Sequence, residues 1–223
     1  MIFLFDESAG AKQLNIRGEN FKYLIKVRRH VEGDILSFRE RQKIEILHTY
    51  KIVSIEPRAV QLELIESKKV QIKPKKELHI GWCVIDSKSV EKVLASLNEI
   101  GVGKISFIYC ERSQKNFKAD FKRYERILEA SNQQCGRTEL MEFESYKNLQ
   151  SFLEAYPDTK VFDFTDKVLE CESDFSTVLI GCEGGFSDSE RELLQKQEVF
   201  RLNTPMVLRS ESAALAVASK ILL

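Results

Sequence analysis

Two segments near the carboxyl end combine residue types that packing alone does not require. In the first, residues 178–187, an apolar run enters a turn with Gly181, Glu183, Gly184 and Gly185, and a helix-opening Ser-Asp-Ser-Glu follows. Glycine lets the backbone approach a ligand closely, and open α/β sheets bind ligands at the carboxyl ends of their strands. The segment therefore predicts a ligand-binding turn, with an ordinary strand-to-helix turn as the alternative. Dinucleotides and nucleoside triphosphates are disfavoured, because the turn has neither Gly-x-Gly-x-x-Gly spacing nor a P-loop lysine.

The second segment, residues 202–214, ends in an Arg-Ser-Glu cluster ahead of an apolar helix. Ser210 suits the N-cap of that helix, and Glu211 suits the positive end of its dipole, so capping is one explanation for both. Arg209 has no such structural explanation. Its guanidinium could meet a phosphate, a carboxylate or a developing negative charge. We therefore expect Arg209 to act on an anion.

Two further polar segments place an arginine at the end of an element. Residues 110–113, Cys-Glu-Arg-Ser, follow an apolar strand and would lie on the ligand-facing edge of the sheet. Residues 133–137, Gln-Gln-Cys-Gly-Arg, close a helix, where an arginine also compensates the helix dipole. We expect a functional role for Arg112, whereas Arg137 fits either explanation.

Cysteine and histidine spacing indicates neither a disulfide framework nor a metal site. The five cysteines include no Cys-x-x-Cys pair, and the three histidines lie scattered. Buried, reduced thiols are expected, with a nucleophilic Cys135 or Cys182 as the alternative. No metal is predicted.

The composition, with 43% hydrophobic and 30% charged residues, is that of a soluble globular protein. No apolar run approaches the roughly 20 residues of a membrane span, and the amino terminus lacks a secretory signal. A cytoplasmic protein that does not enter membranes is therefore expected. Lysine plus arginine and aspartate plus glutamate both number 34, a balance that counts against a dedicated nucleic-acid binder. Phosphate contacts need only a local patch, and two segments are locally basic, although solvated surface is the alternative: Lys22, Lys26, Arg28 and Arg29, then Lys68, Lys69, Lys73, Lys75 and Lys76.

The patterning changes near residue 70, which predicts two domains, 1–70 and 71–223. The first contains short strand-like runs that a small β-barrel would close, and residues 67–76 follow as a connection. In the second, strands alternate with helices, which predicts an α/β fold whose parallel sheet is covered on both faces. The predicted strands are 2–5, 35–38, 44–53 and 60–65, then 78–85, 104–110, 160–164, 177–180 and 199–202. The predicted helices are 90–100, 121–135, one opening at 187, and 213–222.

Together these segments resemble the bacterial 16S ribosomal RNA uridine-N3 methyltransferases, a family of the knotted SPOUT class. The similarity spans nearly the whole chain, with the motifs in the family's order. It departs from the family pattern at Cys182, where proline is usual, at Gln133, where glutamate is usual, and at Met206, where an arginine is usual. The matching motifs are Lys26-Val27-Arg28-Arg29 with Gly33-Asp34, Glu99-Ile100-Gly101-Val102, Cys110-Glu111-Arg112-Ser113, Gln133-Gln134-Cys135-Gly136-Arg137, Gly181-Cys182-Glu183-Gly184-Gly185-Phe186 and Val207-Leu208-Arg209-Ser210-Glu211-Ser212-Ala213.

The resemblance implies a PUA-like β-barrel that binds RNA, followed by a SPOUT domain with a carboxyl-terminal trefoil knot. It also implies a homodimer and S-adenosyl-L-methionine as cofactor, held by three loops. In this sequence the implied cofactor residues are Phe164, Gly181, Glu183, Gly184, Gly185, Leu202, Asn203, Met206, Val207, Leu208 and Ser210.

The implied reaction is methylation of N3 of a uridine in 16S ribosomal RNA of the small ribosomal subunit. N3 lies on the Watson–Crick edge, so the target base must be unpaired or flipped out. Arg209 would stabilise the charge on the uracil oxygens, with Glu183 and Glu211 as bases or orienting groups. The alternatives are a SPOUT enzyme acting on a ribose 2′-oxygen or guanine N1, a non-catalytic ribosome-assembly protein and, more distantly, a nicotinamide dehydrogenase. The expected RNA contacts are Lys26, Arg28, Arg29, Arg112, Gln134 and Arg137.

Overall fold

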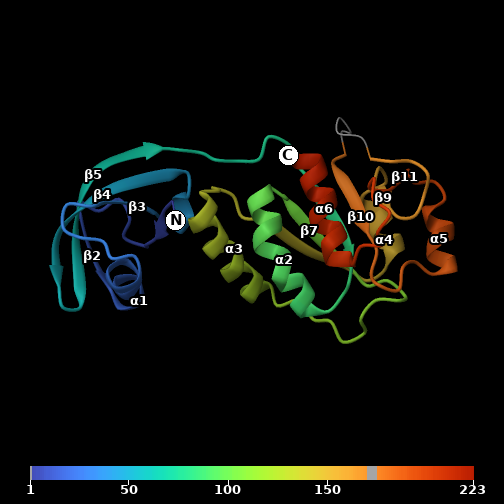
Figure 1. The fold of residues 1–223 in the computed structure, drawn as a ribbon, viewed down its shortest axis with the longest axis horizontal. Coiled ribbons are helices and arrows are strands. Elements are labelled where there is room, and N and C mark those ends of the chain that lie inside the picture. Colours follow the sequence, from blue (N-terminus) through green and yellow to red (C-terminus); the bar gives the residue numbers. More distant parts are fainter. Residues whose placement is uncertain (1, 170–174) are drawn as a thin grey trace. The chain divides into compact units, whose positions relative to one another are not determined.

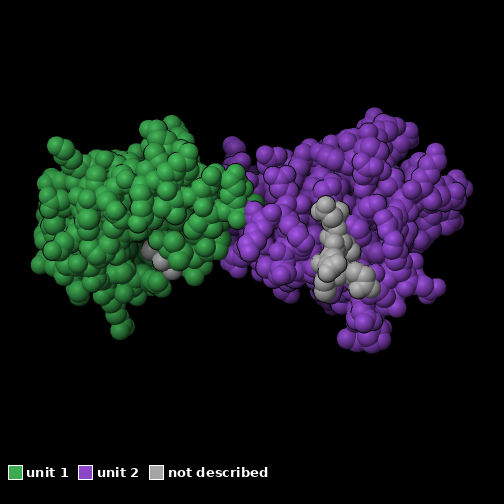
Figure 2. All heavy atoms as spheres, turned by 90° about the horizontal axis from the view of Figure 1, so that it is seen from above, with its two compact units in different colours: residues 1–73, 132–139 green, residues 74–131, 140–223 purple. Residues whose placement is uncertain are grey.

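The computed structural model describes residues 2–169 and 175–223. The chain forms two compact units, coloured separately in Figure 2. Unit 1 runs to Lys73 and includes Asn132–Glu139, and unit 2 comprises Pro74–Ser131 and Leu140–Leu223. The sequence placed the boundary three residues earlier and assigned residues 132–139 to the second domain. Each unit is described by itself below.

Unit 1 contains a five-stranded sheet in the order β1-β3-β4-β5-β2. In the longest pairing, β4 with β5, alternate residues such as Val60 and Leu62 are fully buried, so the period-two pattern is confirmed. Strand β2 was not predicted, and β5 extends into the predicted connection. The strands are β1 (Leu4–Phe5), β2 (Gln13–Arg17), β3 (Ile35–Arg39), β4 (Ile46–Glu56) and β5 (Ala59–Lys69).

A short helical segment of unit 1 carries part of the basic cluster. Helix α1 (Gly18–Phe21) leads directly into a π-helical turn, η1 (Lys22–Val27). Phe21 and Leu24 are buried on its inner side, whereas Lys22 and Lys26 are exposed. The sequence did not predict this helical segment. A 3-10 turn, η2 (Arg41–Lys43), lies between β3 and β4.

Unit 2 contains a six-stranded sheet in the order β11-β9-β10-β6-β7-β8, and every pairing in it is parallel. The predicted parallel sheet is therefore confirmed, whereas β8 was not predicted. The strands are β6 (His79–Cys83), β7 (Lys104–Ile108), β8 (Glu142–Tyr146), β9 (Lys160–Phe162), β10 (Thr177–Ile180) and β11 (Val199–Phe200).

Helices cover both faces of this sheet, as expected. Trp82 of β6 reaches α6 on one face, while the neighbouring Gly81 leaves room for the Phe152 ring of α4 on the other. Helices α2 and α6 pack against each other (Figure 1). The helices are α2 (Ser87–Ile100), α3 (Phe121–Cys135), α4 (Leu149–Ala155), α5 (Asp188–Leu194) and α6 (Ser210–Leu222).

Helix α2 begins and ends where its sequence directs. The Asp86 carboxylate accepts hydrogen bonds from the Lys88 and Ser89 amides, and Gly101 ends the helix at φ +114°. The buried side is the one that the apolar spacing predicted, because Val90 and Leu94 are fully buried. The predicted stop at Gly101 is confirmed.

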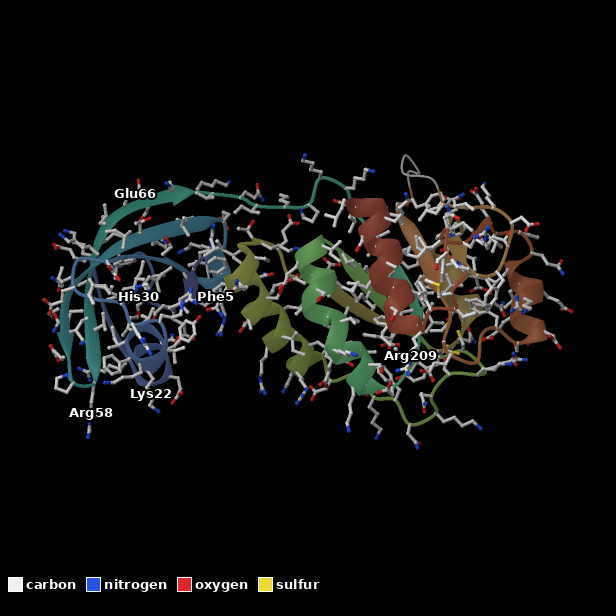
Figure 3. The ribbon with its side chains drawn as sticks, viewed as in Figure 1. Phe5, Lys22, His30, Arg58, Glu66 and Arg209 are labelled. Carbon is white, nitrogen blue, oxygen red and sulfur yellow. The ribbon has the colours of Figure 1, made fainter. Side chains whose placement is uncertain are left out.

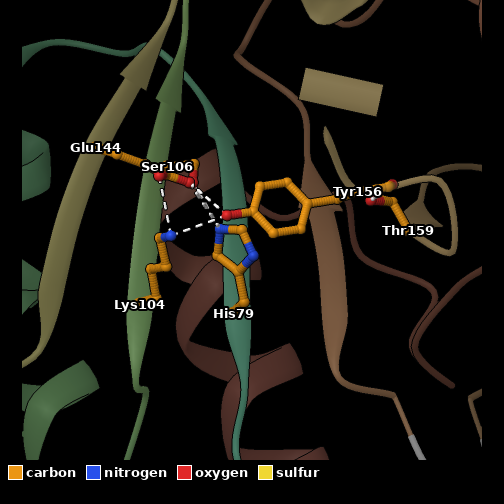
Figure 4. Close-up of polar contacts among 6 residues, drawn as sticks. All are labelled: His79, Lys104, Ser106, Glu144, Tyr156 and Thr159. Carbon is orange, nitrogen blue, oxygen red and sulfur yellow. Dashed lines mark hydrogen bonds and ion pairs between the residues drawn. The ribbon is translucent and has the colours of Figure 1, made fainter. Parts of the chain in front are cut away.

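A closed polar network lies near the amino ends of β6, β7 and β8 (Figure 4). His79 Nε2 lies 2.6 Å from Ser106 Oγ, which donates to Glu144 Oε1 at 2.5 Å. Lys104 Nζ lies 2.9 Å from Glu144 Oε2 and donates to the Tyr156 hydroxyl, which donates in turn to Glu144. Burial, with help from the Lys104 charge, lowers the pKa of His79 to about 4. We call these five side chains the amino-edge network.

Candidate active site

A cavity of about 410 Å³ lies at the carboxyl ends of β9, β10 and β11 and against the start of α6. Ligand pockets in proteins usually measure roughly 300–1,000 Å³. This is the edge of the sheet at which the sequence placed a ligand. The lining residues are Phe162, Asp163, Phe164, Ile180, Gly181, Cys182, Glu183, Gly185, Phe186, Arg201, Leu202, Thr204, Met206, Val207, Leu208, Arg209, Ser210 and Ala213.

Most of the predicted cofactor residues meet at this cavity, although they come from three separate loops. Gly184 and Asn203 are the predicted cofactor residues that do not line it. The predicted residues that do line it are Phe164, Gly181, Glu183, Gly185, Leu202, Met206, Val207, Leu208 and Ser210.

Large apolar side chains stand exposed at the rim of the cavity. Phe164 is 79% exposed, Val207 77% and Met206 66%. Such residues together expose an apolar surface that a bound molecule could cover. The rim is therefore suited to a ligand with a flat or apolar part.

The glycine turn needs its glycines for different reasons. Gly185 has φ +64°, a conformation that side-chain-bearing residues rarely adopt. An added Cβ at Gly184 would lie 3.0 Å from Arg112 Cβ, and the Arg112 guanidinium donates to the Gly184 carbonyl at 3.1 Å. The close approach expected at Gly184 is therefore made by the Arg112 segment of the protein.

A second set of hydrogen bonds anchors the same turn to residues 110–113. Ser187 and Glu190 form the predicted capping box at the start of α5, which is confirmed. The buried Glu190 carboxylate also accepts from the Glu111 amide at 2.9 Å. Ser189 Oγ donates to Glu111 at 2.6 Å, and hydrogen bonds from Ser189 and Ser187 lower the pKa of Glu111. The cavity turn is thus held in place from the end of β7.

Arg209 faces the cavity from the residue before α6, and Figure 3 labels it. Within residues 2–169 and 175–223, its guanidinium has no hydrogen-bond or ion-pair partner. The sequence suggested Ser210 as N-cap, but Arg209 occupies that position and Ser210 is the first helical residue. The prediction of Ser210 as N-cap was therefore wrong. The Ser210 hydroxyl instead donates a hydrogen bond to the Gly181 carbonyl at 2.5 Å.

The two candidate acids lie in different environments. Glu183 is exposed and lines the cavity. Glu211 is 6% exposed, is absent from the cavity lining, and its Oε2 has no hydrogen-bond partner among the described residues. Glu183 is thus the acid that can meet a molecule in the cavity.

The predicted RNA-contact residues differ in accessibility. Lys26, Arg28 and Arg29 are exposed on unit 1, as is Gln134, while Arg112 is exposed beside the glycine turn of unit 2. Arg137 is 5% exposed, and burial lowers its pKa. The expected surface contact by Arg137 does not fit this burial.

Some cavity residues escaped the sequence analysis. Asp163 follows β9 and forms an ion pair with Arg191 at 2.8 Å, and Arg201 follows β11 and donates to the Leu202 carbonyl. Both line the cavity. A charged residue directly after an apolar strand was the available signal, but β9 and β11 are too short for their ends to be placed from sequence.

The described cysteines are free thiols. Cys83 and Cys110 are buried with their sulfur atoms 2.7 Å apart, and burial raises the pKa of Cys83 and of Cys182. A raised pKa disfavours the thiolate that nucleophilic chemistry needs. Cys171 lies outside the described residues. Among the side chains that the structure describes, no group of three or more His, Cys, Asp or Glu could hold a metal ion.

No helix in the described part of the chain is long and apolar enough to cross a membrane.

Comparison with known proteins identifies the class to which this fold and cavity belong. The RNA methyltransferase domain family matches residues 72–222. Ribosomal RNA small subunit methyltransferase E from Helicobacter pylori is 38% identical, and the match covers 98% of both chains. The protein of the same name from Aquifex aeolicus is 25% identical over 84% of this chain and 90% of its own. The chain belongs to the RNA methyltransferase domain family, among its ribosomal RNA small subunit methyltransferase E members, as its motifs predicted.

Solved structures share the fold at lower sequence identity. A putative methyltransferase from Legionella pneumophila, in complex with bound cofactor SAM, aligns with a TM-score of 0.73 at 22% identity, covering 98% of this chain and 94% of its own. Ribosomal RNA small subunit methyltransferase E from Neisseria gonorrhoeae, bound to S-adenosyl methionine, aligns with a TM-score of 0.73 at 16% identity, covering 98% and 95%. The likeness therefore extends over both units.

Proposed function

We propose that this protein transfers a methyl group from S-adenosylmethionine to N3 of a uridine in small-subunit ribosomal RNA. The class of substrate follows from the relatives' names, and the atom follows from the family resemblance of the motifs. The observation that carries the chemistry is the placement of Arg209. Its guanidinium, which has no partner among the described side chains, lines a cavity at the carboxyl edge of a parallel sheet, the usual ligand position of such sheets.

The cavity residues fit the chemical parts of S-adenosylmethionine. The exposed Phe164, Met206 and Val207 side chains offer apolar surface for an adenine ring. The exposed Glu183 carboxylate lines the same cavity and would favour the positive charges of the sulfonium and amino groups, whereas the Asp163 carboxylate there is already paired with Arg191. When bound, this cofactor supplies an electrophilic methyl group.

In the proposed reaction, the chain's own residues prepare the base. Uridine N3 is a poor nucleophile while it is protonated, so the proton must leave and N3 must face the methyl group. Glu183 is positioned to accept that proton or to orient the base, whereas the buried Glu211 is not. Arg209 then stabilises the negative charge that spreads onto the uracil oxygens.

Unit 1 would hold the RNA backbone. Its exposed Lys26, Arg28 and Arg29 offer phosphate contacts without reading the base sequence. A closed PUA-like barrel, a trefoil knot at the carboxyl end, a homodimer and a cytoplasmic location also belong to this proposal. The strand order of the five-stranded sheet in unit 1, with β1 and β2 at its edges, is compatible with a curled sheet that further contacts would close.

The test is nucleoside mass mapping of 16S ribosomal RNA from a deletion strain. The proposal predicts loss of one 3-methyluridine and its return when purified protein and S-adenosylmethionine are added to the deletion-strain subunits. Loss of a 2′-O-methyl nucleoside or of 1-methylguanosine would assign a different RNA position. No affinity for S-adenosylhomocysteine in calorimetry, with RNA binding intact, would favour a non-catalytic assembly protein.

A further inference from the structure

A buried tryptophan is linked to the cavity wall by hydrogen bonds through another side chain. Trp82 is fully buried in β6, and its indole Nε1 donates to Ser210 Oγ at 2.8 Å. Ser210 Oγ donates in turn to the Gly181 carbonyl at 2.5 Å. Two hydrogen bonds therefore join a central strand, the cavity turn and the start of α6. We call this arrangement the Trp82–Ser210–Gly181 relay.

The relay uses the hydrogen-bonding capacity of Ser210. A serine hydroxyl has one proton to donate, and here that proton goes to the Gly181 carbonyl. One acceptor position is taken by the Trp82 N–H, and the Ser210 residue is 5% exposed. The Ser210 hydroxyl therefore has no proton left for a ligand, although the residue borders the cavity.

The relay fixes the residue next to Ser210. Arg209 has no side-chain partner among the described residues, and its N-cap position lacks a side-chain capping bond. Its location is therefore set through the backbone, by the Ala213 amide that donates to the Arg209 carbonyl and by the two hydrogen bonds that hold Ser210. Gly181, at the other end of the relay, also lines the cavity.

We propose that Trp82 and Ser210 are positioning residues, which set Arg209 against the Gly181 turn through these two hydrogen bonds. This inference rests on the proposed methyl transfer, because its effect on turnover is transmitted through Arg209. A misplacement of about 1 Å can cost roughly a hundredfold in rate. Loss of the relay should therefore lower kcat more than it weakens cofactor binding.

The experiment compares Trp82→Phe, Ser210→Ala, the double variant and Ser210→Thr in full-length protein. Trp82→Phe keeps an aromatic ring but removes the N–H, and Ser210→Ala removes both bonds. We expect each single change to lower kcat by about tenfold to a hundredfold, and the double variant to be no slower than Ser210→Ala. The Kd for S-adenosylhomocysteine should stay within about threefold of wild type. Ser210→Thr, which keeps a hydroxyl, should restore most of kcat.

Ser106→Ala is the matched control, since Ser106 is also a fully buried serine with two hydrogen-bond partners, but at the amino-edge network. It should lower the melting temperature without lowering kcat. Weaker S-adenosylhomocysteine binding in Ser210→Ala alone would make Ser210 a ligand and overturn the inference. Unchanged kcat in both Trp82→Phe and Ser210→Ala would overturn it as well. If Trp82→Phe does not fold, the Ser210→Ala and Ser210→Thr pair decides by the same criterion.

A spectroscopic readout separates this inference from the proposed function. Trp82 is the single tryptophan of the chain, so intrinsic fluorescence reports on the relay whether or not the protein methylates RNA. Ser210→Ala should shift its emission to shorter wavelength, and Ser106→Ala should not. If the wild-type protein transfers no methyl group but Ser210→Ala still shifts the emission, the proposed function is wrong and the relay remains. An unchanged emission in Ser210→Ala would remove the relay.

Discussion

The two edges of the parallel sheet in unit 2 differ, among the described residues, in whether a charged side chain is left without a partner. At the amino edge, His79, Lys104, Ser106 and Glu144 bond to one another, and Tyr156 completes the set (Figure 4). At the carboxyl edge, the described residues leave the Arg209 guanidinium without a partner beside a cavity of about 410 Å³. Polar groups that satisfy each other stabilise a fold, whereas groups held without partners remain available to a ligand. We therefore expect the amino edge to contribute to stability and the carboxyl edge to the proposed reaction.

The largest expected effect is at Arg209. Arg209→Ala should lower kcat by about a hundredfold to a thousandfold, because it removes a donor to charge that develops in the transition state. The free energy of unfolding should hardly change, since Arg209 has no partner in the described structure to lose. Steady-state kinetics and urea unfolding of the same preparation measure both. Arg209→Lys, which keeps the charge, should recover part of the rate, and full activity of Arg209→Ala would contradict the role.

The amino edge should instead produce a pH dependence of stability. The pKa of His79 falls from 6.5 to about 4 on folding, so the unfolded chain binds the proton first as the pH falls. The stability that the neutral, buried His79 contributes to the free energy of unfolding is therefore complete above about pH 6.5 and is lost as the pH falls toward about 4. The loss should reach about 3 kcal/mol at most, at 1.36 kcal/mol per pH unit.

Urea unfolding of wild type and His79→Gln across this range measures that contribution. The wild-type curve should decline more steeply than that of His79→Gln between pH 6.5 and 4. Parallel curves would show that His79 titrates alike in both states and would weaken the contrast between the edges.

Glu144 tests the same network at constant pH. Glu144→Ala should lower the free energy of unfolding by about 2 kcal/mol, because Lys104, Ser106 and Tyr156 lose their shared acceptor. The control is Glu142→Ala, an exposed carboxylate on the same strand, which should change stability little. Turnover per folded molecule should be equal in both variants. Reduced turnover in Glu144→Ala would mean that the amino edge also serves the reaction.

The smallest expected change is at the glycine turn. Gly185→Ala places a side chain at φ +64°, which costs about 1–2 kcal/mol of local strain. We expect weaker S-adenosylhomocysteine binding by about tenfold in calorimetry and a free energy of unfolding lowered by about 1–2 kcal/mol. Gly33→Ala is the matched control, with φ +94° and no neighbouring atom within 4 Å of an added Cβ. Equal binding by the two variants would argue that the Gly185 conformation does not shape the site.

Local signals in the sequence predicted the elements whose ends are determined by nearby residues. Gly101 ends α2, and Ser187 with Glu190 opens α5, because these interactions span only a few residues. The parallel sheet followed from alternating patterns. In contrast, β2, β8 and α4 were missed, since elements of only five to seven residues are too short for a reliable periodic signal and are stabilised by pairing or packing with distant strands.

The candidate site was predictable at the level of loops and less so at the level of atoms. The motifs correctly brought residues near 164, 181–185 and 202–210 together at one cavity. They could not reveal that Ser210 bonds Trp82, 128 positions away, or that Gly184 is packed by Arg112. Such contacts depend on the strand order of the sheet, which no local pattern encodes.

The most direct measurement is a crystal structure of the protein with bound S-adenosylhomocysteine. The carboxyl-edge assignment predicts this ligand between Phe164, the Gly181–Gly185 turn and residues 206–208, with Arg209 facing the ligand sulfur. Ligand bound elsewhere, or this cavity empty at saturating concentration, would contradict it.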